Sequence, residues 1–115
     1  TYSVRAKDER EAEKLLSDAH LLQAAGCFGI VLEKIPATLA AQVASELTIP
    51  MIGIGAGGGV DGQVLVIHDM LGISTDFSPR FLRRYANVGD IMQGAFEAYI
   101  KDVKSGDFPN EQEQY

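Results

Sequence analysis

The sequence has a single cysteine, no excess of basic residues and no long hydrophobic run. Cys27 cannot form an internal disulfide, and one thiol is too few for a structural zinc site, so we expect a reducing, cytoplasmic setting. Ten Lys and Arg against sixteen Asp and Glu give a net charge of −6, which argues against nucleic acid as a partner. No apolar run approaches the roughly 18–20 residues that span a bilayer, so we expect a soluble protein without a membrane partner.

The chain is also short and has no initiator methionine. Its 115 residues suffice for one globular domain at most. It starts with Thr1 and enters a structured pattern directly, without the apolar centre of a signal peptide. We therefore expect a piece of a longer protein.

Three segments carry the signals of amphipathic helices. Asp8 and Glu11 form a capping-box pattern, and apolar residues then recur at helical spacing up to Gly26, which predicts a helix over 8–25. A second stripe behind Pro36 predicts a helix over 36–47. The last helix is expected to begin at Asp90 and end at Gly106, with a buried stripe and two lysines in its final turns; these residues are Ile91, Met92, Ala95, Phe96, Tyr99 and Val103, with Lys101 and Lys104.

Short apolar runs between the helices predict strands. Residues 27–32 are apolar at both alternating positions, which is typical of a strand buried on both faces of a parallel sheet. Residues 50–54 form a second such run, and 81–85 a less apolar third. We expect 62–71 to be a helix capped by Asp61, because the preceding glycine-rich residues are too few for the crossover of about a dozen residues that a parallel strand requires.

The alternation of helices and strands predicts the fold class. It indicates an α/β protein with a parallel sheet. Three strands cannot close a barrel, and a complete (β/α)₈ barrel takes roughly 250 residues. We therefore expect the C-terminal half of such a barrel over 1–115, with 108–115 a loose polar tail.

Glu33 is the first candidate for chemistry, because the active site of a barrel lies where its strands end. It directly follows a predicted strand, and Pro36 fixes the chain shortly afterwards. From the residues alone, a salt-bridged or solvated loop carboxylate is the stronger interpretation. General acid or base catalysis is the alternative.

The other candidates have mainly structural interpretations. The run Gly55–Gly59 resembles a phosphate-binding loop, but a flexible turn explains it equally well. We expect His68, beside Asp69, to be packed or hydrogen-bonded, with His20 on another helix and no second histidine at metal-ligand spacing. Cys27 is expected to be inert packing at the start of a buried strand. A small basic cluster can pair either with acidic residues or with an anionic substrate; its members are Arg80, Arg83 and Arg84.

Taken together, several motifs resemble the ketopantoate hydroxymethyltransferase family. The resemblance extends from Glu9 to Pro109, and only the last residues, 111–115, depart from the family's usual ending. The motifs are Phe28-Gly29-Ile30-Val31-Leu32-Glu33 with Ile35-Pro36-Ala37, then Ile49-Pro50 with Ile52-Gly53-Ile54-Gly55-Ala56-Gly57, then Asp61-Gly62-Gln63-Val64-Leu65-Val66 with His68-Asp69-Met70-Leu71-Gly72.

This resemblance implies a (β/α)₈ barrel of the phosphoenolpyruvate/pyruvate superfamily type. It also implies a magnesium ion, and hydroxymethyl transfer from 5,10-methylenetetrahydrofolate to 3-methyl-2-oxobutanoate, which gives 2-dehydropantoate for pantothenate biosynthesis. Glu33 matches the family's catalytic glutamate. The family's metal-binding carboxylates and substrate lysine lie on earlier strands, so no residue here inherits a metal role.

Two further expectations depend on the resemblance. The chain alone should be inactive, and the full protein should be a homo-oligomer, namely a decamer. Two other classes stay open, a related barrel lyase or aldolase acting on a 2-oxo acid, and a non-catalytic fragment. Upstream sequence or an intact mass would discriminate among them.

Overall fold

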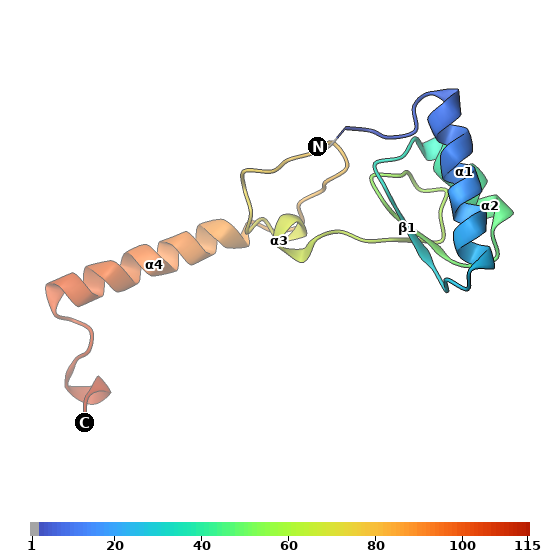
Figure 1. Cartoon of the computed structure of the whole chain (residues 1–115). Coiled ribbons are helices and arrows are strands. Elements are labelled where there is room, and N and C mark those ends of the chain that lie inside the picture. The colour runs from blue at the N-terminus through green and yellow to red at the C-terminus, as the bar shows by residue number, and fades with distance from the viewer. Residues whose placement is uncertain (1–2) are drawn as a thin grey trace. The chain divides into compact units, whose positions relative to one another are not determined.

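The computed structural model describes residues 3–115, which divide into two compact units, Thr1–Leu65 and Val66–Tyr115 (Figure 1). The first unit is an α/β layer structure with a parallel sheet, and the second unit is built mainly from helices and irregular chain. The α/β class with a parallel sheet is thus confirmed for the first unit.

Helix α1, Glu9–Ala24, confirms the helix predicted over 8–25. The Asp8 carboxylate accepts the backbone N–H of Glu11 at 2.8 Å, as a capping box requires. The reciprocal bond is missing, because the Glu11 carboxylate accepts the N–H of Ala6 at 3.0 Å and lies 3.6 Å from the Arg5 guanidinium. Glu11 therefore joins the segment before the helix to its first turn.

Three strands form one parallel sheet within residues 3–115, in the order β1, β2, β3. These are β1 Ile30–Glu33, β2 Met51–Ile54 and β3 Gly62–Gln63. In the register, Leu32 pairs with Gly53, and Gly53 pairs with Gln63 on its other side. The second strand is as predicted, and β1 begins three residues later than the predicted run.

The helix predicted over 62–71 is wrong. Asp61 does not cap a helix, because its N–H donates to the Met51 carbonyl at 3.0 Å and its carboxylate accepts the Met51 N–H at 2.8 Å. These two bonds align the chain with β2, so that residues 55–61 alone suffice as the crossover. Only Ile67–Met70 form a helix in this region, α3.

Helix α2, Ala37–Glu46, follows Pro36, which is the N-cap rather than the first helical residue. Figure 1 shows α1 and α2 on the same side of the sheet. The core lies between these helices and the sheet, and its buried members are Ala6, Ala19, Leu32, Ile35, Ala40, Val43, Leu47, Met51 and Ala56.

The other face of the sheet is exposed in this chain, so the prediction that residues 27–32 are buried on both faces is wrong. Val31 of β1 is 62% exposed, because both helices pack on the opposite face, and Phe28, before the strand, is 94% exposed. Cys27 lies before β1 and is half-buried, so it does not begin a buried strand; its N–H donates to the Leu22 carbonyl at 3.1 Å.

In the second unit, the strand predicted over 81–85 is absent from the described chain. The N–H of Leu82 closes a turn onto the Pro79 carbonyl at 3.0 Å, and the N–H of Tyr85 donates to the Met70 carbonyl at 2.7 Å. No neighbouring strand pairs with these residues in this unit, so the apolar residues of the run do not produce a strand.

Helix α4, Val88–Ser105, begins earlier than the predicted cap at Asp90. Its first N–H groups are satisfied by backbone rather than by a side chain, because Val88 donates to Leu71 at 2.9 Å and Gly89 to Gly72 at 3.0 Å. It ends at Gly106 with φ +80°, as predicted.

The apolar stripe of α4, predicted to be buried, is exposed within its unit; its large members are Ile91, Met92, Phe96, Tyr99 and Val103. The expected loose tail is also partly wrong. Glu111–Glu113 form a short 3₁₀ turn, η1, with a complete capping box from Asn110, and the rings of Tyr99 and Phe108 meet edge to face at 5.6 Å.

No helix of residues 3–115 combines the length and hydropathy needed to cross a membrane.

Candidate active site

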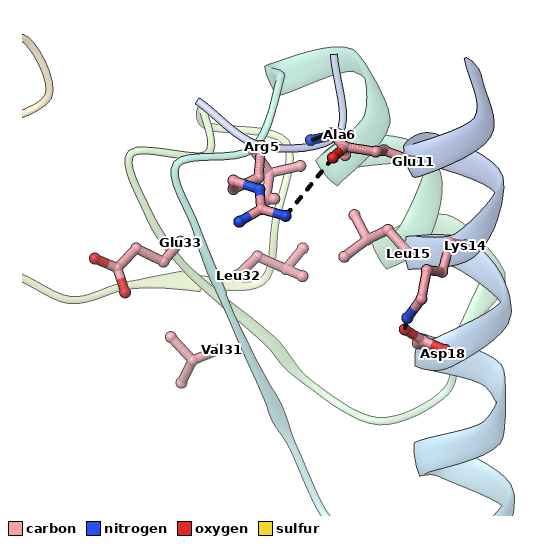
Figure 2. Close-up of a pocket in the computed structure, with 10 residues that line it drawn as sticks. Arg5, Ala6, Glu11, Lys14, Leu15, Asp18, Val31, Leu32 and Glu33 are labelled. Carbon is pink, nitrogen blue, oxygen red and sulfur yellow. Dashed lines mark hydrogen bonds and ion pairs between the residues drawn. The ribbon is translucent and has the colours of Figure 1, made fainter. Parts of the chain in front are cut away.

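Glu33 is the last residue of β1, at the carboxyl end of the parallel sheet. Because side chains alternate along a strand, Leu32 points toward α1 and Leu15, whereas Val31 and Glu33 point to the opposite side (Figure 2). Glu33 is exposed in this chain, not buried. The structure thus places its carboxylate on the face of the sheet that the helices leave uncovered.

The neighbours of Glu33 on this face are apolar. In the parallel register Glu33 pairs with Ile54, and Val31 pairs with Ile52. Paired residues of neighbouring strands share a face, so these four side chains form one surface, which we call the open face. Glu33 is the acidic residue among these four and lies where the strands end. The open face therefore presents a carboxylate at the edge of an apolar surface.

Lys34 holds the backbone directly after Glu33. Its N–H donates to the Ile54 carbonyl at 2.9 Å, and its own carbonyl accepts the N–H of Arg5 at 2.9 Å. It adopts φ +50°, in the left-handed region. No sequence signal points to Lys34, because lysine has no preference for this region as glycine or asparagine has.

A pocket of about 380 Å³ lies on the other side of β1, against α1 (Figure 2). Its charged side chains neutralise one another, since Arg5 pairs with Glu11 at 3.6 Å and Lys14 with Asp18 at 2.7 Å. Glu33 contributes to the pocket's rim, but its carboxylate points away (Figure 2). The pocket and the open face are therefore separate surfaces of β1.

The glycine-rich loop after β2 packs closely on α2. A Cβ atom at Gly57 would lie 2.5 Å from the Cβ of Ala37, and one at Gly59 would lie 2.7 Å from that of Ala41. The side-chain amide of Gln63 donates to the Gly57 carbonyl at 2.8 Å. Close packing therefore accounts for two of the glycines, which favours the interpretation as a turn.

His68 and the arginine cluster lie in the second unit. The side chain of His68 is exposed, so the expectation that it packs is wrong, although its carbonyl accepts two N–H groups after α3. Arg84 donates to the Phe77 carbonyl at 2.8 Å and braces that loop. Arg80 and Arg83 are exposed and make no ion pair within residues 3–115.

Among the residues that the structure describes, no three His, Cys, Asp or Glu side chains lie close enough to hold a metal ion. The chemistry that the open face can perform with its own groups is therefore proton transfer by the Glu33 carboxylate.

The chain is similar to known proteins of one family. The family model described as ketopantoate hydroxymethyltransferase matches residues 1–111. Curated proteins named 3-methyl-2-oxobutanoate hydroxymethyltransferase are similar over the whole chain, with 74% identity in Parabacteroides distasonis, 72% in Porphyromonas gingivalis and 67% in Flavobacterium johnsoniae. The chain spans 42% of the length of each of these relatives.

Proposed function

The chain belongs to the ketopantoate hydroxymethyltransferase family, and we propose that it is the C-terminal part of an enzyme that makes 2-dehydropantoate. The substrates are 3-methyl-2-oxobutanoate and 5,10-methylenetetrahydrofolate, and the product serves pantothenate biosynthesis. The proposal takes its support from the relatives' name and from the match over all 115 residues.

The observation that carries the proposal is the position of Glu33 on the open face. In a (β/α)₈ barrel, one face of each strand points to the barrel interior and the other to the surrounding helices. Here α1 and α2 cover one face, which leaves Val31 exposed and Ile52 and Ile54 half-buried on the other. A barrel completed by the rest of the protein would enclose this face and place Glu33 at its catalytic end.

In this arrangement Glu33 acts as the general base. Its carboxylate takes the proton from C3 of the 2-oxo acid, and the electron pair of the broken C–H bond becomes the enolate of that substrate. C3 then bonds to the folate's methylene carbon, tetrahydrofolate leaves, and water supplies the hydroxyl oxygen in the overall balance. The apolar neighbours of Glu33 would exclude bulk water from the site.

Magnesium and the oligomer complete the proposal. Residues 3–115 bring no three potential ligands together for a metal ion, so the ligands of the magnesium ion would come from the remainder of the protein. The full protein would be a homo-oligomer, namely a decamer. The exposed stripe of α4 is a surface that such an assembly, or the barrel's own closure, would cover.

The test is an assay of the full-length protein for 2-dehydropantoate. We expect formation to require the folate and added Mg²⁺, and the 115-residue chain alone to be inactive. Carbon–carbon bond cleavage or formation without folate would support the related lyase or aldolase instead. No turnover by a folded full-length protein would favour a non-catalytic role.

A further inference from the structure

The backbone at Lys34 departs from the conformation that its residue type prefers. Its φ of +50° lies in the left-handed region, where the Cβ of an ordinary L residue crowds the following carbonyl. Ala6 is the one other residue besides glycine with positive φ in the part of the chain that the structure describes. Such conformations persist only where the surrounding structure fixes them, and they gather at functional sites.

The left-handed turn changes which face the chain presents. In an uninterrupted strand, residues 32 and 35 would lie on opposite faces, because side chains alternate. Instead Leu32 is 4% exposed and Ile35 is 6% exposed, and both belong to the core under the helices. Lys34 thus reverses the alternation, which anchors Ile35 in the core while Glu33 keeps its place on the open face.

Hydrogen bonds hold Lys34 from two directions. Its N–H is bound to Ile54 on β2, and its carbonyl is bound to Arg5, each at 2.9 Å. The Arg5 segment is in turn fixed to α1 by Glu11, which accepts the Ala6 N–H and pairs with the Arg5 side chain. The peptide that follows Glu33 is therefore tied both to the sheet and to the first helix.

We propose that Lys34 is a positioning residue, whose left-handed backbone and not its side chain sets the Glu33 carboxylate for proton abstraction. This inference rests on the proposed role of Glu33 as the base. The conformation fixes the direction of the chain leaving β1 and so limits where the Glu33 carboxylate can lie. Small displacements of a catalytic group slow a reaction without preventing the substrate from binding.

The test is a series of variants of the full-length protein, graded by how readily each residue adopts positive φ. Glycine and asparagine enter the left-handed region easily, whereas β-branched valine does not. We expect Lys34→Gly and Lys34→Asn to keep most of the rate at which the C3 hydrogen of 3-methyl-2-oxobutanoate exchanges with deuterium. Lys34→Val should lower that rate on the order of 10- to 100-fold, with little change in KM.

Gly26 provides the matched control, because it lies before β1 with φ +100° and has no atom within 4 Å of where a Cβ would stand. Gly26→Val imposes the same kind of backbone strain away from Glu33. It should lower the midpoint of thermal unfolding but leave the exchange rate of the remaining folded protein unchanged. If Lys34→Val does not fold, Lys34→Ala keeps the inference testable. Alanine removes the side chain but carries a Cβ as lysine does, so the backbone cost is unchanged and the exchange rate should stay near that of the wild type.

The outcomes separate this inference from the proposed function. Loss of exchange in both Lys34→Gly and Lys34→Asn would overturn it, because the side chain would then be what matters. An unchanged rate in folded Lys34→Val, or a lost rate in folded Lys34→Ala, would also overturn it, provided that Glu33→Gln is slow. If Glu33→Gln itself exchanges at the wild-type rate, the proposed role of Glu33 fails, and the positioning role fails with it.

Discussion

Glu33 and Ile54 lie side by side at the carboxyl ends of two parallel strands, and the carbonyl of Ile54 accepts the N–H of the residue that follows Glu33. The strand neighbour of the candidate base therefore also holds its backbone. One side of this pair of strands is packed against helices and the other is open. Substitutions can test which contacts stabilise this unit and what packs against its exposed surfaces.

Gly59 should be required for the fit of its loop on α2. Gly59→Ala would place a methyl group 2.7 Å from the Cβ of Ala41, and such overpacking costs typically about 1–3 kcal/mol. Ala41→Gly should relieve the contact, so the two changes should show a favourable coupling energy in denaturant unfolding. Gly58→Ala is the control, because a Cβ at Gly58 meets nothing within 4 Å. Equal effects at Gly58 and Gly59 would contradict the packing account.

A surface contact between α1 and α2 should make stability depend on pH. The hydrogen bond from His20, at 3.1 Å, and then that from Gln42 lower the pKa of Glu46 below 4.5. A carboxyl group with a lowered pKa stabilises the fold above its unfolded pKa, and this contribution is lost as the pH falls through the folded value.

The stability difference between wild type and Glu46→Gln should therefore shrink as the pH falls from about 6 to about 3. Denaturant midpoints measured at several pH values would show this, with Glu13→Gln, a change at an exposed glutamate of α1, as the reference. A difference that does not vary with pH would show that the contact does not depend on the ionisation of Glu46.

The 115-residue chain alone should be poorly soluble or molten. It leaves Val31 exposed on the sheet, Phe28 exposed before β1 and six large apolar side chains exposed on α4, and unpaired apolar strand edges favour aggregation. We expect strong binding of a hydrophobic dye and no cooperative thermal transition. A sharp transition in a demonstrated monomer would contradict the half-barrel proposal.

The stripe of α4 should be covered in the full-length protein. Phe96 is 60% exposed in this chain, and an apolar surface of this kind indicates a packing partner. Phe96→Asp should lower the molar mass in light scattering if the partner is another copy, whereas Glu97→Gln on the same helix should not. A wild-type monomer would remove the assembly proposal and leave closure of the chain's own barrel.

Local sequence signals were sufficient to predict the helices and strands of the first unit up to β2. The Asp8 cap, the helical spacing behind it and the short apolar runs depend on neighbouring residues, so they predicted α1, α2 and both strands. Glu33 was predicted to lie at a strand end for the same reason. Its exposure could not be predicted, because that depends on which distant segments pack against this face of the strand.

The errors arose where distant residues decide the structure. Asp61 looks like a helix cap, but its hydrogen bonds to Met51 place the following residues beside β2. The run 81–85 was predicted as a strand from its apolar residues but has no strand beside it in its unit. The stripe of α4 shows which side of the helix is apolar, yet the sequence does not show what covers it. Lys34 gave no signal at all, because its conformation is imposed by its contacts.

The central claim is that Glu33 abstracts the C3 proton. Glutamine keeps the size of the side chain but cannot accept a proton, so Glu33→Gln in the full-length protein should slow turnover by roughly 10² to 10⁴. The fold and magnesium binding should be nearly unchanged, and both serve as controls.

The most direct measurement is the exchange of the C3 hydrogen of 3-methyl-2-oxobutanoate with solvent deuterium, followed by NMR without folate, because it isolates proton abstraction. We predict that Glu33→Gln slows this exchange as much as it slows hydroxymethyl transfer. Exchange at the wild-type rate together with failed transfer would assign Glu33 to a later step, and two unchanged rates would make it a structural carboxylate; either result would contradict the account.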